Sequence, residues 1–268
     1  MDKSALAQLC QQVEKVAQTA GAFLLQESGK VSQDQIEEKG LNSLVSYVDR
    51  TAEEMIVDGL QKLLPEASFL TEEETVDQSA TAAARWIIDP LDGTTNFLFG
   101  LPCYSVSIAL EQEGELVLGV VYEPNRKECF SAWHKGGAYL NGKAIQVRQN
   151  ESLPKALLAT GFPYYDYSRM ENYLALFRHL AQNTTGIRRW GSAAIDLAFT
   201  ACGRFDGFYE YSLNAWDVAA GIVLVREAGG MVTDFAGKEE SLQNGEIVAG
   251  SSALHAKLLG AVQDHMLS

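Results

Sequence analysis

The sequence predicts a mixed α/β protein, and three observations lead to that prediction. Apolar side chains over residues 4–26 recur at three- and four-residue spacing, which is typical of an amphipathic helix. Apolar runs separated by polar turns over 104–147 indicate an antiparallel meander. The second half alternates short apolar runs with helical segments. We therefore expect one large domain or two closely packed halves, 1–150 (α+β) and 151–268 (α/β).

In the first half, predicted elements lead to an acidic loop. After the first helix, residues 26–40 form a polar connection that could act as a mobile flap. A second amphipathic helix is predicted over 47–63. A short strand over 68–71 then ends in three glutamates, 72–74. Functional sites often assemble at strand ends in layered α/β proteins, although exposed acidic loops are also common without a function.

The stretch 89–97 combines two carboxylates with a tight turn. The apolar run 86–88 predicts a buried strand, and Pro90 is expected to help end it because proline cannot donate a ladder hydrogen bond. Gly93 would let a ligand approach the backbone, and residues 94–96 could present free N–H groups at the start of a short helix. Carboxylates for a hard cation beside amides for an anion suit phosphate chemistry. A strand, an Asx-turn and a helix cap without any ligand would give the same pattern.

After residue 103, short strands dominate. The runs 104–110, 116–122 and 128–133 are predicted strands, and 136–143 is predicted to be a further turn before a strand over 144–147. The second half is predicted to contain strand 157–162, helix 170–180, strand 186–190, helix 191–201, strand 205–210 and a helix from 216 that ends at Gly229 and Gly230.

Composition limits the possible functions. The formal net charge of -14, with no run of Lys or Arg, argues against a nucleic-acid-binding surface. It would also repel a phosphate substrate unless divalent cations reversed the local field. No segment approaches about 20 uninterrupted apolar residues, and the first residues do not resemble a secretory signal, so we expect no membrane span and no export. Four scattered cysteines indicate reduced thiols in a cytoplasmic protein. The four histidines lie outside every motif, so the mechanism should not need histidine.

Together these motifs resemble the inositol monophosphatase family of magnesium-dependent, lithium-sensitive phosphatases. Residues 89–97 match D-P-[IL]-D-G-T-x-N-F in full, and 216–221 match W-D-x-A-A-G. The acidic loop resembles G-E-E, with Thr71 where glycine is usual. Residues 43–49 resemble D-L-V-T-x-x-D, with serine in place of the first aspartate and of the threonine. The resemblance implies a layered α-β-α-β-α sandwich of the sugar-phosphatase type, with the site between its halves.

The resemblance also implies a cluster of two or three Mg²⁺ ions. Glu72, Asp89 and the Leu91 carbonyl would hold one ion, and Asp89, Asp92 and Asp217 a second, with Asp89 bridging. A weaker third ion would bind Glu72 and water. Oxygen-only ligands suit Mg²⁺; Mn²⁺ could substitute, and Ca²⁺ and Li⁺ should inhibit. Taken alone, Asp217 would more often cap its helix or interact with the helix dipole than bind a metal.

The implied reaction is hydrolysis of a phosphomonoester by in-line attack of water, without a phosphoenzyme. Glu72 and Thr94 would orient a water activated by the first ion, and Glu72 would accept its proton directly or through Thr94. The amides of Gly93 and Thr94 would bind phosphate oxygens, next to Asp92 and Asp217. No nucleophile other than water stands in these motifs.

For the alcohol half of the substrate, the resemblance points to Glu210, which matches a position that contacts substrate hydroxyls. A carboxylate suits a polyol, whose O–H groups donate, and disfavours a second phosphate. We therefore expect myo-inositol 1-phosphate or a similar sugar phosphate. Alternatives are 3'(2'),5'-bisphosphate nucleotides, histidinol phosphate, NADP and fructose 1,6-bisphosphate, the last if Arg188 or Arg189 points inward. The neighbouring wall would comprise Gly191, Ser192 and Ala193.

Further expectations follow from the same resemblance. Lys39 and Asp49 are candidates for a flap that completes the third metal site, although a carboxylate such as Asp49 also suits the first turn of any helix. Family members are commonly homodimers. A non-enzyme alternative is a regulatory relative that binds RNA machinery; the intact acidic positions and Thr94 argue against loss of catalysis.

Overall fold

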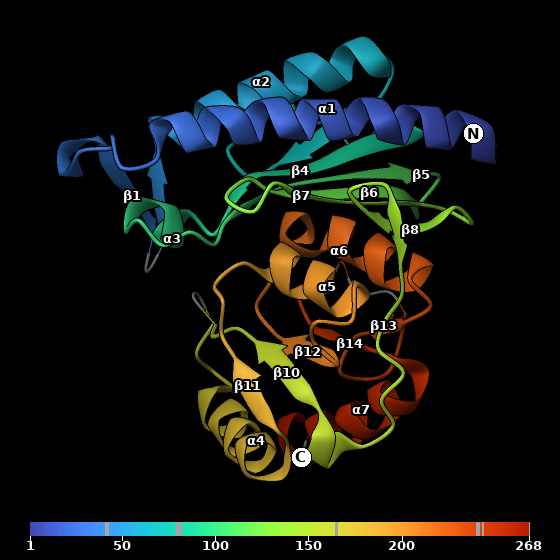
Figure 1. The fold of residues 1–268 in the computed structure, drawn as a ribbon. Helices are drawn as coiled ribbons and strands as arrows, with labels where there is room; N and C mark the ends of the chain where they lie inside the picture. Colours follow the sequence, from blue (N-terminus) through green and yellow to red (C-terminus); the bar gives the residue numbers. More distant parts are fainter. Residues whose placement is uncertain (41–42, 79–81, 164–165, 240–241, 243, 268) are drawn as a thin grey trace.

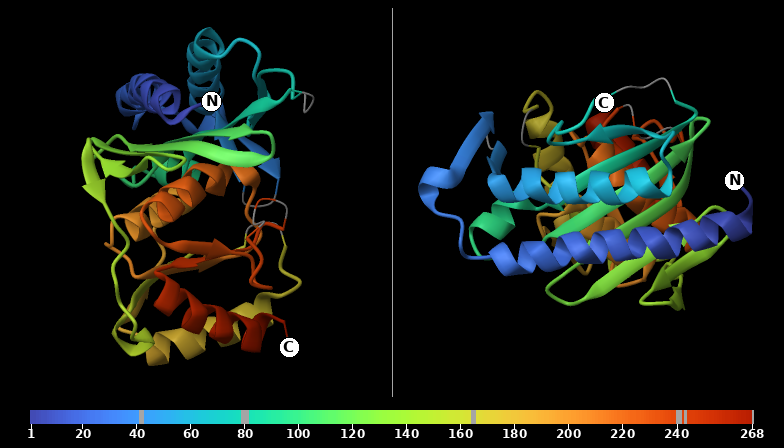
Figure 2. Two further views of the ribbon diagram at one scale, coloured as in Figure 1. Left: turned by 90° about the vertical axis from the view of Figure 1, so that its right-hand side faces the viewer. Right: turned by 90° about the horizontal axis from the view of Figure 1, so that it is seen from above.

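Helices and sheets alternate in five layers (Figures 1 and 2). The computed structural model describes residues 1–268 except 41–42, 79–81, 164–165, 240–241, 243 and 268. This arrangement confirms the predicted α-β-α-β-α sandwich. In order, the layers are α1 (Lys3–Glu27) with α2 (Tyr47–Leu63), a seven-stranded sheet, α5 (Ala193–Ala201) with α6 (Ala215–Glu227), a five-stranded sheet, and α4 (Met170–Asn183) with α7 (Ser252–Met266).

Helices α1 and α2 lie side by side across the seven-stranded sheet, as the right-hand view of Figure 2 shows. Leu9, Val13 and Leu24 of α1 are buried against that sheet, as their spacing predicts. The described part of the polar connection between the two helices contains regular structure. It contains a short 3₁₀ turn and then an antiparallel hairpin of β1 (Ile36–Gly40) and β2 (Ser43–Ser46).

The seven-stranded sheet is antiparallel except where β3 and β4 run parallel. Strand β4 does not end at Pro90, as the sequence predicts, but continues to Asp92; its pairing with β5 is interrupted between Asp89 and Asp92, so proline disturbs the ladder only locally. The predicted turn over 136–143 contains a strand, in which Tyr139 stacks on Trp133. In spatial order the strands are β3 (Ser68–Thr71), β4 (Ala84–Asp92), β5 (Ser105–Gln112), β6 (Glu115–Glu123), β7 (Glu128–Trp133), β8 (Gly137–Leu140) and β9 (Lys143–Ile145).

The five-stranded sheet is mixed, and the sequence predictions do not include its strands β13 and β14. Strands β11, β10 and β12 are parallel, whereas β14 and β13 are antiparallel to their neighbours. Helix α7 packs on α4 and covers the outer face of this sheet (Figure 1). In spatial order the strands are β11 (Gly186–Arg188), β10 (Leu157–Thr160), β12 (Gly207–Glu210), β14 (Ile247–Gly250) and β13 (Met231–Thr233).

Helices α5 and α6 form the middle layer and are largely apolar. Every residue of α5 is buried, and α6 packs against β5, β6 and β7 of the larger sheet. Of the described helices, none is long and apolar enough to cross a membrane. The four cysteines are all described and form no disulfide; Cys10, Cys103 and Cys129 are buried.

Candidate active site

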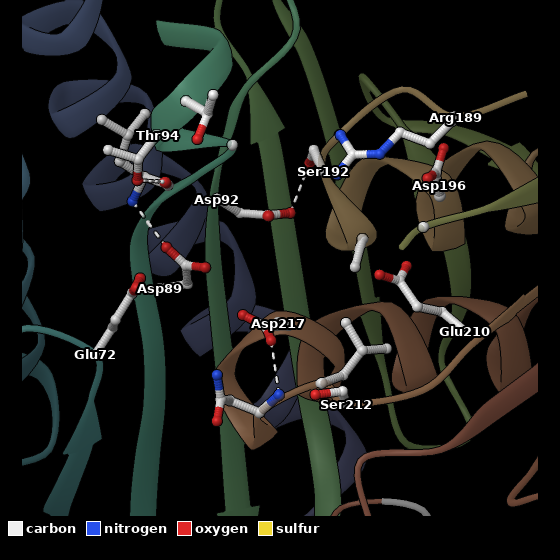
Figure 3. A pocket seen from close by; sticks show the side chains of 18 of the residues that line it. Glu72, Asp89, Asp92, Thr94, Arg189, Ser192, Asp196, Glu210, Ser212 and Asp217 are labelled. Carbon is white, nitrogen blue, oxygen red and sulfur yellow. Dashed lines mark hydrogen bonds between the residues drawn. The ribbon is translucent and has the colours of Figure 1, made fainter. Parts of the chain in front are cut away.

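A polar pocket opens where the end of β4 and the acidic loop face the N-termini of α5 and α6 (Figure 3). Its open volume, including the mouth, is about 790 Å³. Of the predicted site residues whose side chains the structure describes, all but Asp49 line this pocket. The predicted residues among its lining are Glu72, Asp89, Leu91, Asp92, Gly93, Thr94, Gly191, Ser192, Ala193, Glu210 and Asp217.

The irregular end of β4 brings two carboxylates and a turn to the pocket. Asp89 Oδ1 accepts a hydrogen bond from the Leu91 N–H at 2.9 Å, which stabilises the irregularity at Pro90. Gly93 follows with φ +97°, in the left-handed region that favours glycine. A Cβ at this position would lie 3.1 Å from the Cys103 carbonyl oxygen. The turn therefore requires glycine, and helix α3 (Thr94–Leu98) begins directly after it.

The side chain of Thr94 contacts helix α2. Its hydroxyl lies 3.1 Å from Asp49 Oδ1 and 3.0 Å from the Leu91 carbonyl oxygen, both of which can accept its proton. Asp49 is buried and accepts two further hydrogen bonds from Ser46, as part of the capping box of α2. Asp49 thus caps the helix in whose first turn it lies, and it also contacts Thr94. The side chain of Lys39 lies outside the described residues.

Asp92 and Asp217 each accept hydrogen bonds at the N-terminus of a helix. Asp92 Oδ2 accepts hydrogen bonds from Ser192 Oγ at 2.6 Å and from Ala194 N at 2.8 Å, at the first turn of α5. Asp217 Oδ2 accepts from Asn214 N at 2.7 Å, as the capping carboxylate of α6. The dipole of each helix favours negative charge at these positions. The pocket therefore gathers carboxylates from both halves of the chain.

Burial raises the pKa of three aspartates in the pocket, and neighbouring carboxylates add to the shift for Asp89 and Asp217. Burial, followed by the negative charges of Glu72, Asp92 and Asp217, raises the pKa of Asp89 well above its ordinary value. Burial and the neighbouring Asp92 raise the pKa of Asp217 to about 8. Burial raises the pKa of Asp92 to about 6, against the opposing hydrogen bond from Ser192. A bound cation would favour the ionised forms of all these groups.

The donor set fits a hard divalent cation such as Mg²⁺, because the groups that could bind a metal here offer oxygen atoms. Within the described part of the chain, however, no three Asp, Glu, His or Cys side chains form a ready-made metal site. In the hydrogen bonds above, Asp92 and Asp217 each use only one carboxylate oxygen, Oδ2.

The far wall of the pocket contains Glu210, Arg189 and Asp196 (Figure 3). Burial raises the pKa of Glu210 to about 8, while the positive charge of Arg189 opposes that shift. Both Arg188 and Arg189 are exposed, but Arg189 lines the pocket, whereas Arg188 donates to the carbonyl of its neighbour Ile187. The sequence left open which arginine points inward; the structure selects Arg189.

Asp196 is a pocket residue that the sequence reasoning missed. It is buried in α5, and among the described residues its Oδ1 atom has no hydrogen-bond partner. Burial, followed by the charges of Glu210 and Asp92, raises its pKa well above the ordinary value. A single acidic residue within the otherwise apolar stretch 193–201 was the signal available in the sequence.

The fold and this pocket place the chain among layered α/β proteins that have an acidic site between two sheets. The chain belongs to the inositol monophosphatase family, whose model matches residues 5–267; the family is a class of metal-dependent phosphatases. The chain is 42% identical to an inositol-1-monophosphatase of Mesorhizobium japonicum over 98% of both chains. It is 43% identical to the Nus factor SuhB of Pseudomonas aeruginosa over 94% of both.

Solved structures agree with this assignment. The extragenic suppressor protein suhB of Bartonella henselae superposes with a TM-score of 0.89 at 42% identity, covering 93% of this chain and 96% of that one. An inositol monophosphatase of Anabaena superposes with a TM-score of 0.85 at 35% identity and 97% coverage of both chains.

Proposed function

We propose that this protein is a Mg²⁺-dependent phosphomonoesterase that acts on myo-inositol 1-phosphate or a similar polyol phosphate. One observation carries the proposal: Glu72, Asp89, Asp92 and Asp217 line the same pocket as Gly93, Thr94 and Glu210. An acidic pocket repels a phosphate by itself, so the site needs cations to bind one. Family membership supports phosphatase activity at the level of the class.

In this proposal, Glu72, Asp89 and the Leu91 carbonyl hold one ion, and Asp89, Asp92 and Asp217 hold a second. When bound, Mg²⁺ supplies charge to stabilise the phosphoryl group and acidifies the attacking water. Glu72 accepts the water proton, and the Thr94 hydroxyl, fixed by Asp49 and Leu91, orients the water.

The phosphate is placed at the turn between β4 and α3. The amides of Gly93 and Thr94 donate to its non-bridging oxygens, because the left-handed Gly93 lets the group approach the backbone. No side chain is needed as a nucleophile, so hydrolysis proceeds in one displacement by water. On the far wall, Glu210 accepts hydrogen bonds from substrate hydroxyls, beside Ser192 and Ala193.

The test is phosphate release from inositol monophosphates, with and without Mg²⁺. Asp92→Asn should lower kcat/KM by at least about 100-fold with Mg²⁺ present, because a neutral amide weakens the second ion's site and its contacts with α5. Inversion at a chiral phosphate is expected for a single displacement. Substantial turnover by Asp92→Asn, or retention at phosphorus, would contradict the proposed mechanism.

Two specific observations favour other roles. Because Arg189 lines the pocket, a substrate with a second phosphate, such as fructose 1,6-bisphosphate or a bisphosphate nucleotide, has a cation available to it. Relatives named Nus factor SuhB are 43% and 42% identical to this chain, so a role with RNA machinery is the second candidate. Co-purification with ribonucleoprotein complexes that persists in Asp92→Asn would support a role separate from the pocket.

A cytoplasmic homodimer inhibited by Li⁺ completes the proposal. The unpaired cysteines are consistent with a reducing compartment. Sedimentation measures the oligomeric state, and Li⁺ titration of the phosphatase assay measures the inhibition.

A further inference from the structure

Glu53 is a fully buried carboxylate on α2, one helical turn after Asp49, and it binds the acidic loop. Its Oε1 atom accepts hydrogen bonds from Thr71 Oγ1 and from both N and Oγ1 of Thr75, each at 2.8 Å. Its Oε2 atom accepts from Glu73 N at 2.8 Å. One carboxylate therefore fixes the residues directly before and after Glu72.

The loop needs such an anchor for two reasons. It contains three consecutive glutamates, and Glu72 faces the buried Asp89, whose pKa its charge raises. When these carboxyl groups are ionised, like charges at close range oppose this placement of the loop. In addition, Glu74 has φ +53°, a left-handed conformation that is unfavourable for a residue other than glycine. The four hydrogen bonds to Glu53 offset both effects.

Thr71 strengthens this anchor where the family pattern has glycine. Its hydroxyl donates to Glu53, and it accepts a hydrogen bond from Gln78 Nε2 at 3.0 Å. Gln78 Oε1 in turn accepts from Thr71 N at 2.8 Å. A glycine could donate only its backbone N–H, so this chain ties the loop to α2 through a contact that the usual residue cannot make.

We propose that Glu53 is a positioning residue for Glu72, reinforced in this chain by Thr71 and Gln78. The role assigned to Glu72 rests on the proposed phosphatase function; the anchoring of the loop does not. Helix α2 thereby fixes both groups that handle the attacking water: Asp49 contacts Thr94, and Glu53 holds the backbone around Glu72.

The experiment compares Glu53→Gln with Glu123→Gln. Glu123 is an equally buried glutamate that accepts hydrogen bonds from Asn125 and Arg126, in a turn that does not line the pocket. In Glu53→Gln, one donor must face the new amide N–H₂, so the loop should loosen. We expect a fall in kcat of about tenfold or more, with KM for substrate changed less than about threefold. We also expect a weaker apparent affinity for Mg²⁺ and faster amide hydrogen exchange at Glu73 and Thr75.

Glu123→Gln should lower the melting temperature similarly but leave kcat, Mg²⁺ dependence and exchange in the loop unchanged. The proposal is overturned if Glu53→Gln loses stability yet keeps wild-type kcat and exchange over residues 71–75. If Glu53→Gln does not fold, Thr71→Val removes one donor and no charge, and should lower kcat by about threefold with faster exchange at Thr75. An inactive wild-type protein would refute the phosphatase proposal, whereas the exchange measurement would still decide the role of Glu53.

Discussion

Arg189 brings a guanidinium group into a pocket lined mainly by carboxylates. Its charge lowers the pKa of Glu210, Asp196 and Asp92, so it favours the forms that accept hydrogen bonds from hydroxyl groups. We infer that Arg189 supports polyol recognition through these carboxylates. The alternative is that it binds a second phosphate directly.

We predict that Arg189→Gln raises KM for inositol 1-phosphate about three- to tenfold and changes kcat little, because Glu210 loses the neighbouring positive charge. Arg188→Gln is the matched control, since that side chain does not line the pocket and donates to a carbonyl of its own strand. Steady-state kinetics on inositol 1-phosphate and fructose 1,6-bisphosphate would separate the two roles. A loss confined to the bisphosphate would show that Arg189 binds a second phosphate.

The pocket carboxylates also predict how stability depends on pH. With raised pKa values of about 6 for Asp92 and about 8 for Asp217, the folded, metal-free protein holds protons that the unfolded chain loses above about pH 4. Stability without metal should therefore fall as pH rises from about 4 to about 8, and Mg²⁺ should stabilise most at the alkaline end of that range. Thermal melts with chelator or Mg²⁺ across this range measure both effects. Asp217→Asn should reduce the dependence of metal-free stability on pH. An unchanged dependence in that variant would contradict the raised pKa of Asp217.

Site residues that belong to a sequence motif could be predicted from the sequence, whereas site residues that stand alone in the sequence could not. Asp89 and Asp92 are three residues apart, and Gly93 follows directly. Two aspartates at this spacing before a glycine strongly favour a polar turn. Glu53 and Asp196 stand alone in helices, where an acidic residue is usually solvated. Their burial depends on the packing of α2 and α5, which one sequence does not reveal.

At the scale of elements, long periodic helices and apolar strands could be predicted best. The apolar face of α2 predicts a helix over about 47–63, which are the observed bounds, and the structure adds a capping box at its start. Strand β8 was mistaken for a turn because three of residues 136–142 are glycine, although pairing with β7 fixes it. Strands β13 and β14 are three and four residues long, too short for periodicity to distinguish them from loops.

At the scale of the molecule, α6 connects the two sheets. Its backbone crosses β6 so closely that a Cβ on Gly119 would lie 2.5 Å from the Ala220 carbonyl oxygen. On its other side, a Cβ on Gly221 would lie 2.5 Å from Leu197 Cβ of α5. Asp217, at the N-terminus of the same helix, lines the pocket. The middle layer thus couples the packing of the predicted halves, 1–150 and 151–268, to the geometry of the site, and we expect them to unfold as one cooperative unit.

We predict that Gly119→Ala destabilises the whole molecule by roughly 1–3 kcal/mol or more, because the new methyl group meets backbone that cannot rotate away. It should also weaken Mg²⁺ binding, since any shift of α6 moves Asp217. Gly260→Ala is the control, because a Cβ there meets nothing within 4 Å and alanine favours the helix.

Far-UV circular dichroism and tryptophan fluorescence report on both halves, with Trp86 and Trp190 on opposite sides of residue 150. The two signals should give one coincident transition that shifts to lower temperature in Gly119→Ala; two separate transitions, of which only one shifts, would show that the halves unfold independently.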